Sequence, residues 1–513
     1  MNINQKILSL YQAFLAFSAI VVTTQVFAEH QVFFFPSTAE AETRQGFVRV
    51  INHSDLSGEV SITAVDDAGV EKGPIALSLS ANSAKHFNST DLEEGNAGKG
   101  LSGGVGTGQG AWRLSMESDL DIEVLSYIRT RDGFVTTMHE TLPSSSNNSL
   151  HRYAVIFNPA SNYNQVSSLR LINNTHRNAQ VSITGVDDQG ISGNVVKLSI
   201  PANAVRMFTS QELESGTGEG ITSGALGDGT GKWQLFIESD QPLVALSVLE
   251  SPTGHIANLS TLPKTHSNKH IVPLFPASAD SKGRQGFLRV TNHSSQDATV
   301  SISAFNNTDW EYEPVTLSLE AHKTQHFNSD DLELGNEDKG LTGSTGIGEG
   351  DWYLELSSDQ DISVMAYLRT PGGFLTSAHD LIMGQEDGTY HRVAIFNPGS
   401  NYNQVSVLRV INLGEEDADI VVSGIDDSGS SPGTDVSFMV PAGKFRAITA
   451  QELETGVREF SEMETGFEDE SIEGALADGT GKWQLIVQSS VPVFVMSILE
   501  TPTGHLTNLS TTP

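Results

Sequence analysis

Acidic residues stand in adjacent pairs near the ends of predicted strands, and this pattern is the one most suited to chemistry. Each pair is followed by one further residue and then by a glycine. Neighbouring carboxylates on a loop suit Ca²⁺, which prefers oxygen ligands. Asp and Gly at such a place also supply the backbone geometry of a hairpin turn. One copy has Asn306 and Asn307 instead, which favours the turn and leaves calcium as the alternative. The pairs are Asp66 and Asp67, Asp187 and Asp188, and Asp426 and Asp427.

Other patterns that would indicate catalysis or a cofactor do not appear in the sequence. The glycine-rich stretch 103–110 runs into a tryptophan strand, whereas a phosphate-binding loop needs a following helix and a lysine. The histidines recur in register, but no His-x-His or His-x₃-His pair favours zinc. With no cysteine in the chain, thiolate sites are excluded. Neither a nucleophile elbow nor a His-Glu-x-x-His motif is present. The sequence therefore predicts no enzymatic activity and no cofactor.

These residues belong to a unit of about 120 residues that occurs four times. An arginine strand, a short amphipathic turn, a glycine-rich loop and a tryptophan strand follow one another in each copy. The first and third copies match best, as do the second and fourth, so the order is A-B-A-B. Such arrays usually build scaffolds or binding surfaces. We place a signal peptide at 1–28 and the units at 29–150, 151–269, 270–390 and 391–513.

The start of the chain and its charge indicate an exported protein. Lys6 precedes a mostly apolar stretch, and Val26-Phe27-Ala28 resembles a cleavage site. No later run is long and apolar enough to span a membrane. The net charge of −34 disfavours nucleic acid as a partner. We therefore expect a secreted or periplasmic protein, with surface proteins or glycans as its partners.

Short alternating runs separated by Gly, Asn and Asp predict an all-β fold. About eight such runs per unit point to a sandwich of two antiparallel sheets. Each unit also carries a capping-box spacing, with an apolar residue before the cap and a leucine inside, which predicts a one-turn helix. The strand spacing and the signal peptide resemble tandem immunoglobulin-like β-sandwich modules of bacterial secreted and surface proteins. The cap residues are Asn88, Thr209, Asn328 and Thr449.

The A and B units differ in charge at one equivalent place. Arg129 and Arg369 in the A units correspond to Glu250 and Glu500 in the B units. Opposite charges at equivalent positions could orient A against B in a pair of about 240 residues, although independent drift of exposed positions explains them equally well. The fourth unit alone has an acidic insertion, Val457–Glu473, which is typical of a solvated loop.

We expect a non-catalytic adhesion, matrix or scaffold protein from this combination. A carbohydrate-binding protein with repeated sites is the second hypothesis, and an exported hydrolase without a recognisable motif is the third. Sugar sites need exposed aromatic rings, and only Trp310, followed closely by Tyr312, has the setting of such a platform in the sequence.

Overall fold

The computed structural model describes residues 28–138, 150–252, 254–260, 267–308, 312–348, 350–373, 375–378, 388–457 and 471–510. Most of them lie in antiparallel strands, and the helices are short, so the all-β prediction is confirmed. No helix in these ranges is long and apolar enough to cross a membrane. The predicted signal peptide lies outside the described residues, except for its last residue, Ala28.

In the first unit, two four-stranded sheets enclose one apolar core. Their strand orders are β1-β6-β3-β4 and β5-β2-β7-β8. Val48 and Val50 of one sheet share this core with Ile62 and Leu114 of the other. The strands are β1 (Ala28–Phe35), β2 (Arg44–Asn52), β3 (Gly58–Asp66), β4 (Glu71–Leu79), β5 (Ala84–Asn88), β6 (Trp112–Ser118), β7 (Ile122–Thr130) and β8 (Val135–Thr137), with 3-10 turns η1 (Thr38–Glu40) and η2 (Ala97–Lys99).

The second unit repeats this plan with one additional edge strand. Its sheets have the orders β14-β12-β11-β15-β9 and β13-β10-β16-β17, and its core again draws on both. The strands are β9 (His151–Phe157), β10 (Val166–Asn173), β11 (Ala179–Val186), β12 (Val196–Ile200), β13 (Val205–Thr209), β14 (Ile221–Ser223), β15 (Trp233–Ser239), β16 (Leu243–Glu250) and β17 (Ile256–Asn258).

In the third and fourth units one long strand joins all the other strands into a single sheet, of eight strands in the third unit and seven in the fourth. The long strands are β24 (Asp351–Arg369) and β31 (Trp483–Glu500), and each takes the place of two strands of the earlier units. The other strands are β18 (Ser267–Pro276), β19 (Gln285–Asn292), β20 (Ala298–Phe305), β21 (Val315–Leu319), β22 (Thr324–Asn328), β23 (Leu341–Thr342), β25 (Leu375–Ala378), β26 (Gly388–Phe396), β27 (Val405–Ile411), β28 (Ala418–Asp426), β29 (Val436–Val440), β30 (Phe445–Thr449) and β32 (Leu506–Asn508), with the turn η4 (Glu337–Lys339).

Each unit contains the short helix predicted from its capping residues. In the first, the Asn88 side chain accepts from the Asp91 backbone N–H at 3.0 Å, and Asp91 accepts from the Asn88 N–H at 2.9 Å. Leu92 is fully buried, as are its three counterparts, because the helix closes one end of the core. The helices are α2 (Ser89–Glu94), α3 (Ser210–Ser215), α4 (Ser329–Leu334) and α5 (Ala450–Thr455).

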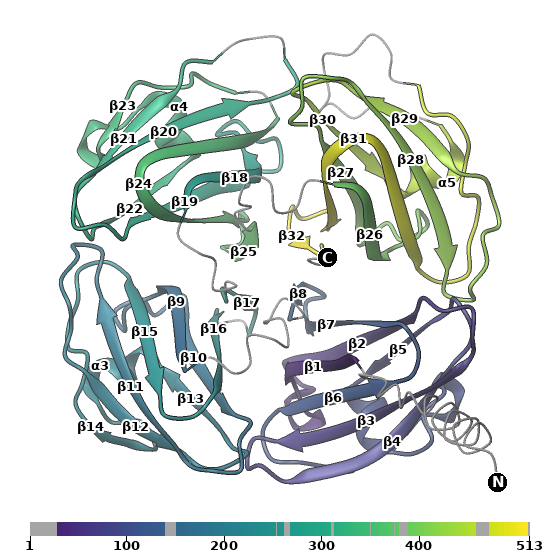
Figure 1. The fold of residues 1–513 in the computed structure, drawn as a ribbon, viewed down its shortest axis with the longest axis horizontal. Coiled ribbons are helices and arrows are strands. Elements are labelled where there is room, and N and C mark those ends of the chain that lie inside the picture. The colour runs from purple at the N-terminus through teal and green to yellow at the C-terminus, as the bar shows by residue number, and fades with distance from the viewer. Residues whose placement is uncertain are drawn as a thin grey trace, which may run out of the picture.

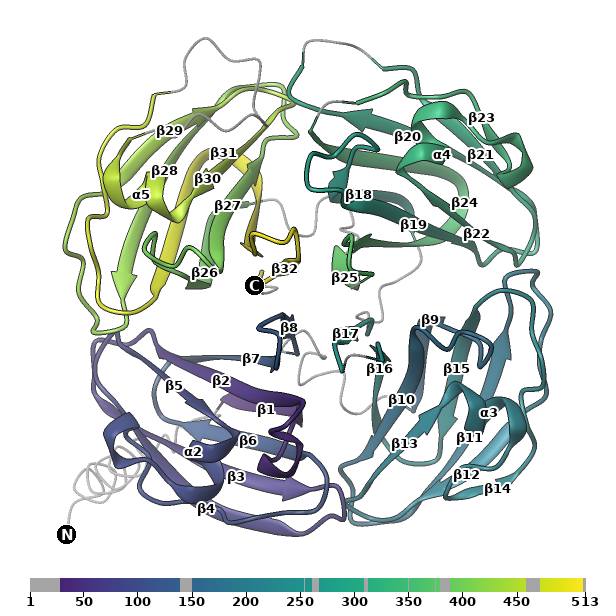
Figure 2. The ribbon, with the colours of Figure 1, turned by 180° about the vertical axis from the view of Figure 1, so that it is seen from behind.

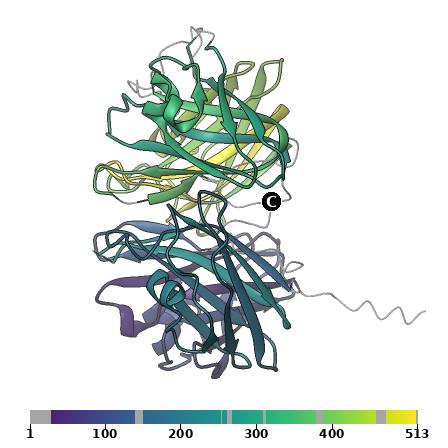
Figure 3. The ribbon, with the colours of Figure 1, turned by 90° about the vertical axis from the view of Figure 1, so that its left-hand side faces the viewer.

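Figure 1 shows the four units arranged in a ring, and Figure 2 shows the same ring from behind. Figure 3 shows it from the side. The short strands β8, β17, β25 and β32 lie nearest the middle and contact one another in turn. Every unit shares an apolar cluster with both neighbours, so A–B pairs are not set apart from each other. These clusters include Phe34 and Ile172 between units 1 and 2, Ile156 and Met365 between units 2 and 3, Ile271 and Phe445 between units 3 and 4, and Ile395 and Ile51 between units 4 and 1.

Candidate functional site

A buried arginine lies in one strand of each unit that pairs with a neighbour on both sides; these strands are β2, β10, β19 and β27. Val48 and Val50 point into the core of the first unit, so Arg49 between them points out of the opposite face of the sheet. That face is covered by the neighbouring unit, and Arg49 is 0% exposed. Burying a guanidinium is costly unless the charge is paired and hydrogen-bonded. The equivalents Arg170, Arg289 and Arg409 are 1%, 1% and 2% exposed.

The paired carboxylate comes from the preceding unit in the ring. Arg170 donates to both carboxylate oxygens of Asp67, at 3.1 Å from Nη1 to Oδ2 and at a shorter distance from Nη2 to Oδ1. Arg289 pairs with Asp188 across the next junction through a contact from Nη1 to Oδ1 at 2.5 Å. Arg49 pairs with Asp427, and its Nε donates to the Ala394 carbonyl at 3.0 Å. Both contacts of Arg49 join the fourth unit to the first and close the ring.

The third junction uses a carboxylate from a different position. Asn307 occupies the place of the second acid, and Arg409 instead lies 3.6 Å from Asp351. The Arg409 Nε donates to the Pro273 carbonyl at 3.1 Å, and its guanidinium lies over the Phe445 ring. Burial lowers the pKa of Arg409 to about 10. Asp351 directly precedes the tryptophan of its strand, where the other units have Ala111, Lys232 and Lys482.

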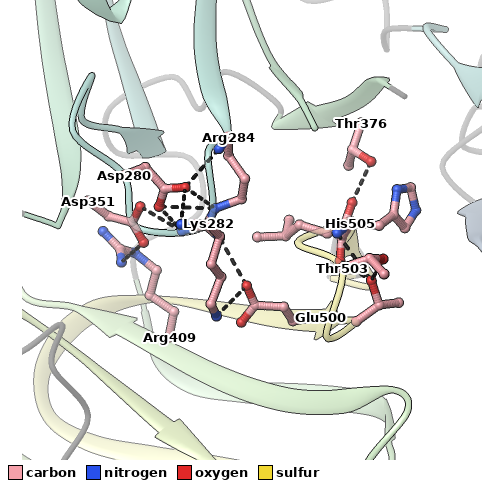
Figure 4. A network of polar contacts seen from close by, with 11 residues as sticks. Asp280, Lys282, Arg284, Asp351, Thr376, Arg409, Glu500, Thr503 and His505 are labelled. Carbon is pink, nitrogen blue, oxygen red and sulfur yellow. Dashed lines mark hydrogen bonds and ion pairs between the residues drawn. The ribbon is translucent and has the colours of Figure 1, made fainter. Parts of the chain in front are cut away.

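Asp351 also belongs to a larger ionic network at this junction (Figure 4). Arg284 lies 2.7 Å from Asp280, 3.5 Å from Asp351 and 3.3 Å from Glu500. Lys282 approaches Glu500 at 2.6 Å. Burial alone would lower the pKa of Arg284, but the surrounding carboxylates raise it above its ordinary value. The network therefore holds Arg284 charged inside the junction.

The first acid of each pair has a local role, as the turn interpretation predicts. Asp66 accepts from the backbone N–H groups of Val70 and Gln109, both at 2.9 Å. Asp187 and Asp426 bond to their own turns in the same manner. Burial alone would raise the pKa of Asp426, but hydrogen bonds from the Ser428 side chain and nearby backbone N–H groups hold it below its ordinary value. The carboxylates proposed for calcium thus accept turn or junction hydrogen bonds, and in the described ranges no group of three or more His, Cys, Asp or Glu residues could hold a metal ion.

The charged residues that distinguish A from B have other partners than the predicted ones. Glu250 lies 3.3 Å from Arg44 of the first unit, and Glu500 bonds Lys282 and Arg284 of the third. Among the described residues no ion pair joins Arg129 to Glu250 or Arg369 to Glu500. The predicted acid of each B unit does contact a cation of the preceding A unit, but that cation is not the predicted arginine. The reason is cross-strand packing: Arg129 and Arg369 lie over the rings of Phe47 and Phe287 in their own units.

Of the two residues of the predicted aromatic platform, the structure describes only Tyr312. Trp310 lies outside the described residues, as does most of the acidic insertion of the fourth unit. The Tyr312 ring meets Trp352 edge-on, at 4.6 Å between centroids, and its hydroxyl accepts from the Asn306 side chain at 3.1 Å. Tyr312 therefore packs its ring against the core of the third unit, and its hydroxyl is hydrogen-bonded within the turn.

Two histidines meet near the middle of the ring. The rings of His255 and His505 are 5.2 Å apart, and Phe134 lies 4.6 Å from His505. Burial and, to a smaller extent, the neighbouring His505 lower the pKa of His255 to about 3, and burial lowers the pKa of His505 to about 4. Both side chains are therefore neutral at neutral pH and pack as uncharged groups.

An open cavity of about 770 Å³ lies where the fourth unit meets the first. Arg44, Arg129 and Arg131 line it on one side, together with Asp132. The fourth unit contributes the amides of Asn401, Asn403 and Gln404 and the residues Thr501, Pro502 and Thr503. Guanidinium and amide donors on facing walls suit a ligand that carries carboxylate, sulfate or phosphate groups.

A second cavity, of about 320 Å³, is lined only by residues of the second unit. The exposed ring of Tyr163 borders it, along with Glu214 and Asp228. Tyr163 was not among the residues predicted from the sequence, although it lies in a segment that is repeated in the chain. The segment Asn-Pro-x-Ser-Asn-Tyr-Asn-Gln occurs at 158–165 and again at 397–404, only in the B units.

Comparisons with known proteins add little to this geometry. No protein-family model and no curated sequence matches the chain. A glycoside hydrolase family 32 structure from Bifidobacterium adolescentis is similar at 10% identity over 94% of this chain and 99% of that one, with a TM-score of 0.14. Dimeric latent PorU from Porphyromonas gingivalis is similar at 11% identity over 67% of this chain and 30% of that one, also with a TM-score of 0.14. Scores this low carry no argument about fold or function.

Proposed function

We propose that the protein is an exported, non-catalytic scaffold or adhesion component, built from four β-sandwich modules of two alternating types. One observation carries this proposal: a buried arginine–carboxylate pair occurs at every junction, and the pair of Arg49 and Asp427 closes the ring. The charged groups most suited to chemistry are thereby committed to holding the modules together. A closed ring presents its loops at fixed relative positions, which suits the display of binding surfaces.

Export is part of the proposal and is compatible with the pairing of the first strand. Cleavage before Glu29 would keep the pairing of β1 with β6 from Glu29 to Phe35. Buried ion pairs and apolar junctions also offer stability to a chain that has no cysteine for disulfides.

The test is made in the cell that produces the protein. We expect the mature chain outside the cytoplasm, with Glu29 as its first residue by N-terminal sequencing. Loss of the gene should reduce attachment of cells to surfaces or to one another, and the full chain should restore it. A variant with Arg49→Glu, which opposes ring closure, should be exported but restore attachment poorly. Retention in the cytoplasm, or turnover of glycoside or ester substrates by the purified chain, would contradict the proposal.

Carbohydrate binding is the second candidate function, and a specific observation favours it. Tyr163 and Tyr402, at equivalent places in the two B units, are 79% and 73% exposed. Large aromatic rings that remain exposed on a soluble surface commonly mark binding sites. In this proposal the aromatic platforms are the two tyrosines of the B units, in addition to the Trp310 expected from the sequence.

A further inference from the structure

A glutamate beside the core tryptophan is bonded differently in the A and B units. In the first unit, Glu93 accepts from the Trp112 indole at 2.8 Å and from the Thr38 backbone N–H at 3.0 Å. Its second oxygen accepts from the Thr38 hydroxyl. Glu333 makes the same three bonds with Trp352 and Ser278 in the third unit. Both A-unit carboxylates are buried and bonded through both oxygens.

The B units have no hydroxyl at this place, because Ala160 and Gly399 replace Thr38 and Ser278. Glu214 accepts through Oε1 from the Ala160 N–H at 3.1 Å and from the Trp233 indole at 2.9 Å. Within the described residues its Oε2 has no hydrogen-bond partner, and the side chain borders the cavity of about 320 Å³. Glu454 accepts from the Gly399 N–H through Oε2 at 3.0 Å and from the Trp483 indole through Oε1 at 2.7 Å. It therefore uses both oxygens, but it too lacks the hydroxyl bond of the A units and is half-buried.

The residues around this carboxylate recur as a set. The cavity of the second unit is lined by Tyr163, Gln211, Glu214, Ser215 and Asp228. The fourth unit carries Tyr402, Gln451, Glu454, Thr455 and Asp478 at the same places. In the A units the position of Asp228 holds Thr107 and Ile347.

Resting on the second candidate function, we propose that each B unit binds one pyranose residue of a glycan at this place, giving two equivalent sites per chain. The exposed tyrosine ring stacks on the apolar face of the sugar. The carboxylates of Glu214 and Asp228 accept hydrogen bonds from its hydroxyl or amino groups, and Gln211 can donate to a ring or hydroxyl oxygen. A volume of about 320 Å³ is at the lower end of ligand pockets, which suits one sugar residue rather than a long oligosaccharide.

The experiment uses the full mature chain on an array of neutral, N-acetylated and free amino-sugar oligosaccharides, with a polylysine peptide as a further probe. The best-retained oligosaccharide is then titrated calorimetrically, and we expect two sites per chain. Tyr163→Ala should remove one site, and Tyr163→Ala with Tyr402→Ala should weaken binding by roughly tenfold or more. Tyr163→Phe with Tyr402→Phe keeps both rings and should retain binding. Tyr390→Ala, which removes a half-exposed tyrosine elsewhere, is the matched control.

Several results would overturn this site. One is the absence of retention of every sugar class on the array; another is unchanged sugar affinity in the double alanine variant. Retention of polylysine alone would assign the tyrosine and the carboxylates to a basic peptide instead. The scaffold proposal is judged separately, because the tyrosines are exposed and these variants should melt at the temperature of the natural chain. Loss of sugar binding without loss of attachment would therefore leave the ring proposal standing.

Discussion

Arg49 in the first unit forms an ion pair with Asp427 in the fourth, 378 positions later in the chain. The same relationship joins Arg170 to Asp67 and Arg289 to Asp188. Because the first and last units carry complementary members of this pair, a linear array of repeats becomes a closed ring.

Asp427→Asn should lower the stability of the whole ring. The substitution leaves the buried Arg49 guanidinium without its carboxylate, and breaking a buried pair from one side costs about 3–5 kcal/mol. The melting temperature and denaturant midpoint of the full chain measure the effect. Asp435→Asn, at an exposed position of the same unit, is the control and should change little. Equal midpoints for the two variants would show that the Arg49–Asp427 pair contributes no stability.

The third junction offers a rescue experiment. Asp351→Asn removes the carboxylate shared by Arg284 and Arg409 and should destabilise the chain. Adding Asn307→Asp restores an acid at the position used by the other junctions. We expect the double variant to recover part of the loss, with a coupling energy above about 0.5 kcal/mol in a double-mutant cycle. Strictly additive effects would mean that position 307 does not reach the arginine.

Leu92→Ala should destabilise the first unit by about 2–5 kcal/mol, because it opens a cavity where helix α2 closes the core. Denaturant unfolding of the full chain measures the loss. Leu334→Ala is a matched control in the corresponding helix of the third unit, since that side chain is 68% exposed. Similar losses for both substitutions would contradict the assigned role of the helix.

Stability should fall as the pH drops from about 6.5 towards 4. Burial, followed by the nearby cations Lys482 and Arg49, lowers the pKa of His86 to about 3, and His255 and His505 have pKa values of about 3 and 4. In the unfolded chain these groups take up protons near pH 6.5, so unfolding is favoured progressively below that value. Carboxylates with lowered pKa, such as Asp426, act only below about pH 4.

Melting temperatures between pH 7.5 and 4.5 test this window. The variant with both His255→Gln and His505→Gln should show a flatter dependence on pH than the natural chain. If the two curves were parallel, the central histidines would not be the titrating groups.

Calcium should have little effect on stability. Asp66 accepts hydrogen bonds from its turn, and Asp67 accepts from Arg170 and from the Ala111 N–H at 3.0 Å. A calcium ion would have to displace these donors, including a buried guanidinium. The melting temperature in millimolar calcium should therefore equal that in chelator, and a saturable rise with calcium would contradict this assignment.

The sequence by itself determined the strands, the repeat and the capped helices. Alternation in Trp112–Ser118 and the caps at Asn88 and Thr209 are local patterns, because neighbouring residues of the same segment satisfy them. The turn role of Asp66 is equally local, with its glycine three positions on.

Only the tertiary structure decided what the remaining charged and aromatic residues do. Asp67 looked like a turn residue, yet its carboxylate pairs with Arg170 in the next unit. The charge difference between A and B units could be read from the sequence, but its partners could not. Arg129 packs over the Phe47 ring of its own unit, and Glu250 forms its ion pair with Arg44. These choices depend on which faces meet when the ring closes, and a one-dimensional pattern does not contain that geometry. The physical reason is that a buried charge takes the nearest available counter-charge in space, whatever its distance along the chain.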